Sequence, residues 1–125
     1  MPWRILIADD EPNIVTSLEF LMRRCNYEVC VARNGEEALQ LVESFRPNVV
    51  LLDVMMPLKS GFEVCRQIRA NPAFEPVRIL MLSARGRDVE IDKGIALGAD
   101  AYVTKPFSTR DLVAKVQELL PQGAA

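Results

Sequence analysis

Short, mostly apolar runs alternate with helical patterns along the whole chain. The apolar runs cover residues 4–8, 28–32, 49–52, 77–82 and 101–104. Each is followed by apolar side chains at helical spacing, as Leu18, Leu21 and Met22 are after the first run. Strands that alternate with helices imply a parallel sheet with helices on both of its faces. The run at 49–52 supports this fold class, because it is apolar at every position and a strand covered on both faces has that composition.

Turn and capping residues indicate where the helices begin and end. We expect helices from residue 12 to 24, after Asn34-Gly35 up to Pro47, from Phe62 to near Asn71, from 88 to 97 and from 109 to 120. Pro12 suits the first turn of a helix, where its missing N–H would have no partner anyway. Gly98 suits the end of the fourth helix. Residues 55–61 are expected to form a loop, with Pro57 and Gly61 as turn residues.

The number and order of these elements restrict the topology. Five strands and five helices in 125 residues fit a flavodoxin-like, doubly wound (βα)5 domain with a five-stranded parallel sheet in the order 2-1-3-4-5. Right-handed crossovers exclude most other arrangements. We expect residues 1–121 to form this one domain and residues 122–125 to be a tail or the start of a linker. The chain would then be either a stand-alone domain or the front of a longer protein.

Polar residues follow four of the strands at the same edge of this sheet. Asp9 and Asp10 follow the first strand, Asp53 the third, Ser83 the fourth and Lys105 the fifth. Ligands of open parallel sheets bind beyond the carboxyl ends of the strands. Crowded carboxylates repel one another unless a cation or a proton intervenes. The pattern therefore predicts a Mg²⁺ site with a lysine beside it, which is an arrangement suited to handling a phosphoryl group.

Composition argues against several other classes of function. The net charge of −2 is unlike the basic surface of a nucleic-acid-binding module, and no apolar run approaches the length of a membrane span. The absence of His, together with the unpaired spacing of Cys25, Cys30 and Cys65, disfavours a zinc site. A strand that begins at residue 4 leaves no room for a signal peptide. With its cysteines taken as reduced, the chain is expected to be cytoplasmic.

Each of these residues also has a simpler interpretation when it is taken alone. Asp9 and Asp10 could be the acidic start of a helix, and Asp53 could be a turn residue. Lys105 could be a solvated surface lysine, and Tyr102 could serve only for packing. Three acids at one sheet edge, however, would cost stability without a ligand. The combination therefore favours the metal and phosphoryl site.

Four motifs in this order resemble the receiver domain of two-component response regulators. They are ILIADDE at 5–11, VLLDVMMP at 50–57, LSA at 82–84 and GADAYVTKPF at 98–107. The resemblance covers about residues 4–120. It implies a phosphorylation-controlled signalling switch, which is a phosphoacceptor regulatory domain and not an enzyme in the ordinary sense, although such domains assist their own phosphotransfer and dephosphorylation.

The resemblance also implies the members of the metal site. Asp53 would accept the phosphoryl group from the phosphohistidine of a sensor histidine kinase or a phosphotransfer protein. Asp10 and Asp53 would bind Mg²⁺ directly, with the backbone carbonyl of Met55 as a further ligand. Asp9 would act mainly through a metal-bound water.

The same resemblance implies how the signal leaves the site. Lys105 would pair with the phosphoryl oxygens and Ser83 would form a hydrogen bond with one of them, while Tyr102 would be an aromatic rotamer switch coupled to Ser83. The Lys105-Pro106 bond would be cis. The surface of the fourth helix, fifth strand and fifth helix would change and control an output domain or a protein target, without direct binding of nucleic acid or membrane by this domain.

Many relatives in this family whose output binds DNA pair through that surface by fixed salt bridges. This chain keeps Asp100 but has Ala101 where those relatives often carry a second Asp. Exposed ion pairs are individually weak, so losing one need not prevent association. We expect a monomer, or at most a weak dimer that depends on phosphorylation.

Three other functions compete with this one. A flavodoxin-like cofactor binder would need a loop rich in Ser, Thr or Gly after the first strand, where this chain has Asp9-Asp10-Glu11. An aspartyl phosphatase commonly has a second acid two residues after the nucleophile, where this chain has Met55. A pseudo-receiver that only docks partners would not need the complete set of Asp, Lys and hydroxyl residues.

Overall fold

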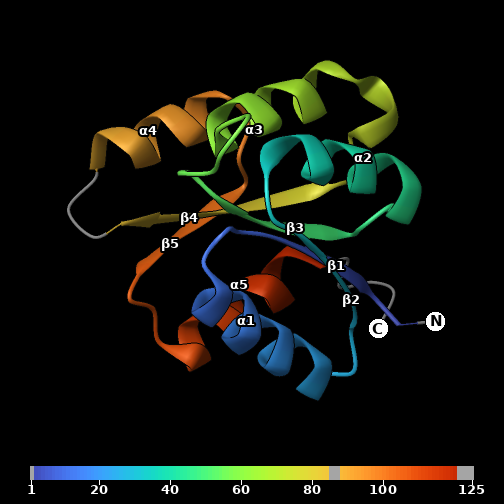
Figure 1. The fold of residues 1–125 in the computed structure, drawn as a ribbon, viewed down its shortest axis with the longest axis vertical. Coiled ribbons are helices and arrows are strands. Elements are labelled where there is room, and N and C mark those ends of the chain that lie inside the picture. The colour runs from blue at the N-terminus through green and yellow to red at the C-terminus, as the bar shows by residue number, and fades with distance from the viewer. Residues whose placement is uncertain (1, 85–87, 121–125) are drawn as a thin grey trace.

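Five parallel strands form one sheet in the order β2-β1-β3-β4-β5 (Figure 1). The structure is a computed structural model and describes residues 2–84 and 88–120, so the expected tail at 122–125 lies outside the described residues. The strands are β1 Arg4–Ala8, β2 Glu28–Ala32, β3 Val49–Asp53, β4 Arg78–Ala84 and β5 Ala101–Lys105. The helices are α1 Pro12–Arg24, α2 Gly35–Phe45, α3 Gly61–Ala70, α4 Asp88–Ala96 and α5 Thr109–Leu119, with a short 3-10 helix at Pro72–Phe74. The predicted fold and strand order are confirmed.

The largest departure from the expected boundaries is in β4. This strand begins at Arg78 and continues to Ala84, two residues beyond the expected end, because Ser83 and Ala84 pair with Thr104 and Lys105 of β5. Ser83 therefore lies within the sheet and does not start a loop. The 3-10 turn after α3 was not predicted. It begins where the side chain of Asn71 accepts a hydrogen bond from the Ala73 N–H (3.0 Å).

Side-chain caps explain several helix starts. The Glu37 N–H donates to Asn34 Oδ1 (2.8 Å), and the Asp111 N–H donates to Ser108 Oγ (3.3 Å). These bonds satisfy backbone donors that have no partner inside the first turn. At α3 the cap is Ser60, so Gly61 belongs to the helix and not to the loop in which it was expected.

The helices cover the two faces of the sheet unequally. Helices α1 and α5 lie on one face, and α2, α3 and α4 lie on the other (Figure 1). The central strand β3 is buried at all five positions and serves both cores. Val50 and Leu52 pack with the larger helix layer, while Val49 and Leu51 pack with α1 and α5. This is the alternation that a strand covered on both faces requires.

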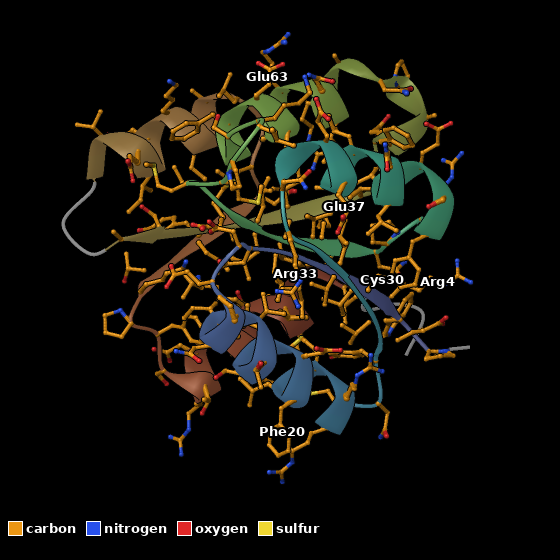
Figure 2. All side chains as sticks on the ribbon, viewed as in Figure 1. Arg4, Phe20, Cys30, Arg33, Glu37 and Glu63 are labelled. Carbon is orange, nitrogen blue, oxygen red and sulfur yellow. The ribbon has the colours of Figure 1, made fainter. Side chains whose placement is uncertain are left out.

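Some side chains on the outer helix faces project away from the sheet. Figure 2 shows Glu63 projecting from α3 and Phe20 from α1, away from the rest of the molecule on opposite sides. Phe20 is 61% exposed, and the Arg24 guanidinium lies 5.7 Å from the centre of its ring.

Among the helices of the described residues, none has both the length and the apolar character that a membrane crossing requires.

Arg69 joins the end of α3 to the connection between α4 and β5. Its guanidinium donates to the carbonyls of Gly98 (2.9 Å) and Val77 (2.6 Å) and pairs with Asp100 (2.7 Å). Gly98 has a φ of +113°, and a Cβ there would lie 2.5 Å from the Arg69 side chain. The expected role of Gly98 at the end of α4 therefore has two causes, which are backbone conformation and close packing.

A second close approach sets the path of the chain after β3. The Gly61 N–H donates to the Val54 carbonyl (2.9 Å), so the start of α3 lies against the end of β3. A Cβ at Gly61 would lie 2.2 Å from the Asp53 carbonyl oxygen. Because that neighbour is backbone, relief of the clash would require the loop or Asp53 to move.

Gly61→Ala is expected to lower the free energy of unfolding by roughly 2 kcal/mol, since backbone atoms must shift to admit the methyl group. Gly94→Ala is the control, because its Cβ would meet Met81 at an ordinary 3.4 Å and gain about 1 kcal/mol of helix propensity. Urea unfolding of both variants measures the two changes. Equal stability of Gly61→Ala and the unaltered chain would contradict the close approach.

Candidate functional site

The topology brings the predicted polar residues to one edge of the sheet. Asp9 and Asp10 directly follow β1, while Asp53 is the last residue of β3 and Lys105 is the last residue of β5. Strands β1 and β3 are neighbours, and the Asp9 N–H donates to Ala32 of β2 (3.1 Å), which fixes the start of the loop. The three acids and the lysine therefore meet as expected.

The three carboxylates form a compact cluster. Asp9, Asp10 and Asp53 each offer an oxygen within 4.8 Å of the others. Asp9 is fully buried and Asp53 is 5% exposed, whereas Asp10 faces solvent. The cluster therefore has two desolvated acids at its base and one acid at an accessible side.

Lys105 holds the buried base of the cluster together. Its Nζ lies 3.0 Å from Asp9 Oδ2 and 3.3 Å from Asp53 Oδ1. Burial by itself lowers the pKa of this ammonium, but the hydrogen bond to Asp9 and the charges of Asp53 and Asp9 outweigh it and leave the pKa raised. Lys105 is therefore a fixed positive charge at neutral pH.

One ammonium does not neutralise the cluster. Burial and then the charge of Asp9 raise the pKa of Asp53 to about 6, although Lys105 and the Met55 N–H act in the opposite direction. An excess of negative charge among carboxylate oxygens is what a hard divalent cation relieves, and Mg²⁺ prefers such oxygen ligands. The residues present fit Mg²⁺ held by Asp9, Asp10 and Asp53. The Met55 carbonyl stays a prediction as a further ligand.

Ser83 lies at the same edge of the sheet, but its hydroxyl is not directed at the three carboxylates of the cluster. It is 1% exposed, and its hydroxyl lies 3.2 Å from Glu90 Oε1 in α4 and 3.4 Å from its neighbour's carbonyl, that of Ala84. Tyr102 on β5 is 43% exposed, and its role as a switch stays a prediction. The Lys105-Pro106 bond is cis, as expected.

Two acidic residues that contact the site were not predicted from the sequence. Glu11 lies 3.3 Å from the Lys105 ammonium and adds a third acid around it. Its position directly after Asp9-Asp10 was a usable signal, because the loop after a strand of this sheet faces the site. Glu90 contacts Ser83 from another element, and no sequence pattern connects the two residues.

Asp53→Asn is expected to stabilise the metal-free protein at pH 7.5 by up to about 3 kcal/mol. The reason is that the folded pKa of about 6 exceeds the ordinary 3.8, and each unit is worth about 1.4 kcal/mol. A raised acid pKa means that the folded state binds the proton more tightly, so stability is lost as pH rises from about 4 to about 6. Denaturant unfolding in EDTA at pH 7.5 and at pH 3.5 measures the effect.

Asp92→Asn, an exposed acid on α4, is the control for this measurement. It should change stability little at either pH. The gain of Asp53→Asn should largely disappear at pH 3.5, where the carboxyl is mostly protonated in both states. A loss of stability in Asp53→Asn at pH 7.5 would show that Asp53 is not electrostatically strained.

Comparisons with known proteins agree on one kind of domain. The family model described as "Response regulator receiver domain" matches residues 5–117. The chain is 47% identical over 119 residues to the alkaline phosphatase synthesis transcriptional regulatory protein PhoP of Bacillus subtilis. That match covers 94% of this chain and 48% of the relative, so this chain spans about half the relative's length.

Solved structures show the same likeness. A protein from Chloroflexus aurantiacus that is described as a response regulator matches with a TM-score of 0.92 and 35% identity, over 95% of this chain and 98% of that one. The receiver domain of a sensor histidine kinase from Pseudomonas aeruginosa matches with a TM-score of 0.87 and 27% identity, over 95% and 98% of the two chains. That structure contains a magnesium ion coordinated in its active-site cleft.

Proposed function

This chain belongs to the response regulator receiver domains, and on that premise we propose that Asp53 is the residue that becomes phosphorylated. Receiver domains are phosphorylation-controlled signalling switches. The observation that carries the assignment is the position of Asp53, which ends β3 at 5% exposure with the Lys105 ammonium 3.3 Å from its carboxylate. Asp9 is fully buried and closer to Lys105, at 3.0 Å, so Asp53 is the more accessible of the two buried acids.

The residues around Asp53 suit attack on a phosphoryl group. A carboxylate and a phosphoryl group are both negative, so their approach is unfavourable unless nearby positive charge offsets it. Bound by Asp9, Asp10 and Asp53, Mg²⁺ would supply part of that charge. Lys105 would supply a further positive charge from a partly buried position. In the transfer, an Asp53 oxygen forms the new bond to phosphorus while the bond from phosphorus to the donor nitrogen breaks, and the donor keeps that electron pair.

Ser83 and Tyr102 are proposed to carry the signal to the surface. Ser83 is one residue beyond the position paired with Asp53 and can donate its hydroxyl to a phosphoryl oxygen. Tyr102 is exposed beside a hollow of about 530 Å³ that β5 and α5 line. An inward turn of Tyr102 would change the surface formed by α4, β5 and α5. A few kcal/mol of differential phosphoryl contact suffices for such a population shift.

The proposed partners follow from this role. The phosphoryl donor would be a sensor histidine kinase or a phosphotransfer protein in the cytoplasm. The changed α4–β5–α5 surface would act on an output domain or a protein target. A cofactor-binding function is less consistent with the site, because the loop after β1 presents carboxylates, which repel a phosphate-containing cofactor, where such a binder needs N–H donors.

Incubation with acetyl phosphate and Mg²⁺ is expected to add the mass of one phosphoryl group, and Asp53→Asn should abolish the addition. Intact-protein mass spectrometry measures both results. EDTA should prevent labelling, since without the cation the negative donor meets uncompensated carboxylates.

The Asp92→Asn variant should be labelled as well as the unaltered chain, because Asp92 lies on the exposed side of α4. If Asp53→Asn takes up one phosphoryl group under the same conditions, another residue is the acceptor. Peptide mapping of the labelled protein would then identify it.

The chain is expected to be a monomer without a phosphoryl group and at most a weak dimer with beryllofluoride and Mg²⁺. Asp100 pairs within its own chain with Arg69 (2.7 Å) and Arg78 (3.5 Å), so its carboxylate is occupied. Ala101 lacks the charge that dimeric relatives often carry there. Analytical ultracentrifugation measures the state, and Ala101→Asp should strengthen the activated dimer. A tight dimer without beryllofluoride would refute this expectation.

A further inference from the structure

The Ser83 hydroxyl is engaged by α4 in the unphosphorylated protein. Ser83 follows Met81 by two residues on β4, so the two side chains point to the same face of the sheet, which α4 covers. Glu90 of α4 lies 3.2 Å from the Ser83 oxygen through Oε1. A hydroxyl has one proton to donate. While Ser83 donates to Glu90, it cannot donate to a phosphoryl group on Asp53.

Among residues 89–96 of helix α4, the buried part lies in the second half of the helix. Among residues 89–96, Gly94 alone is buried, and its nearest neighbours are Met81 and Phe62. The Lys93 ammonium lies 4.6 Å from the centre of the Phe62 ring. Both contacts are in the second half of the helix. The Ser83–Glu90 bond is a contact that ties the first half of α4 to the sheet.

We propose that Glu90 is a positioning residue that holds Ser83 away from the phosphoryl site and releases α4 when Asp53 is phosphorylated. This inference rests on the proposed role of Asp53. Two effects act in the same direction. The phosphoryl oxygens compete with Glu90 for the single hydroxyl proton, and their negative charge repels the Glu90 carboxylate. The first turn of α4 then loses its bond to β4.

The energetic consequence is that Glu90 opposes activation. In the unaltered chain, the Ser83–phosphoryl hydrogen bond forms only at the expense of the Ser83–Glu90 bond. Without Glu90, the hydroxyl is available at once. A hydrogen bond to a charged group at a partly exposed position corresponds to a factor of about ten in an equilibrium constant.

Binding of beryllofluoride with Mg²⁺, in which beryllofluoride stands in for the phosphoryl group on Asp53, tests the inference in the 125-residue chain. NMR titration should show that Glu90→Ala binds it about tenfold more tightly than the unaltered chain. In a Ser83→Ala background, Glu90→Ala should change the affinity by less than about twofold, because the hydroxyl through which it acts is absent. Amide exchange at residues 92–94 should speed up in the unaltered chain when beryllofluoride is added.

Controls separate this inference from the proposed function. Asp92→Ala removes the same charge from the same helix and should leave the affinity unchanged. Thermal unfolding confirms that each variant is folded. If Asp53→Asn binds beryllofluoride as well as the unaltered chain, the proposed function fails. If the unaltered chain binds it through Asp53 but Glu90→Ala binds no more tightly, or tightens equally with and without Ser83, the role of Glu90 is wrong and that of Asp53 stands.

Discussion

The pairing of one partly buried ammonium with two buried carboxylates is the constraint on which the site depends. Lys105 reaches Asp9 and Asp53 from the end of β5, although β1, β3 and β5 are not all neighbours in the sheet. Without that charge, two desolvated acids at the end of adjacent strands would repel each other strongly. With it, one acid still has a pKa of about 6, so the site keeps an unsatisfied demand for positive charge. Binding of a cation at this edge of the sheet would relieve that excess of negative charge.

The fold follows from the sequence because its signals agree with one another. The apolar run at 49–52 is buried at every position, and a helix begins at the Asn34-Gly35 break, where the sequence predicts one. Asp9, Asp10, Asp53 and Lys105 could be placed together because parallel strands deliver their ends to one edge. The extension of β4 through Ser83 could not be predicted, because it depends on pairing with β5 and not on the apolar pattern. The same holds for Glu90, whose contact with Ser83 exists only after α4 has packed on the sheet.

The helices of the protein differ in how firmly they are attached to the sheet. Helices α1 and α5 bury Leu18, Met22, Leu112 and Val116 against the sheet. Helix α4, among residues 89–96, buries a single glycine. A helix that buries so little apolar area gains little stability from packing, and polar contacts such as that of Glu90 with Ser83 exchange partners at small net cost. Under the proposed roles of Asp53 and Glu90, a change at Asp53 would reach the protein surface through α4 without disturbing the main core.

Because the two ends of α4 are attached differently, release of the N-terminal end would let the helix rotate about its C-terminal end. Its C-terminal end is fixed where Arg69 binds the Gly98 carbonyl, and its other end is held by Glu90. The nine residues of α4, at a rise of about 1.5 Å each, form a helix roughly 13 Å long. Motion about the fixed end would displace Val89, which is 81% exposed, much further than Ile95, which lies near the pivot. A partner that contacts Val89 would distinguish the two states of the switch, whereas one that contacts Ile95 would bind both alike.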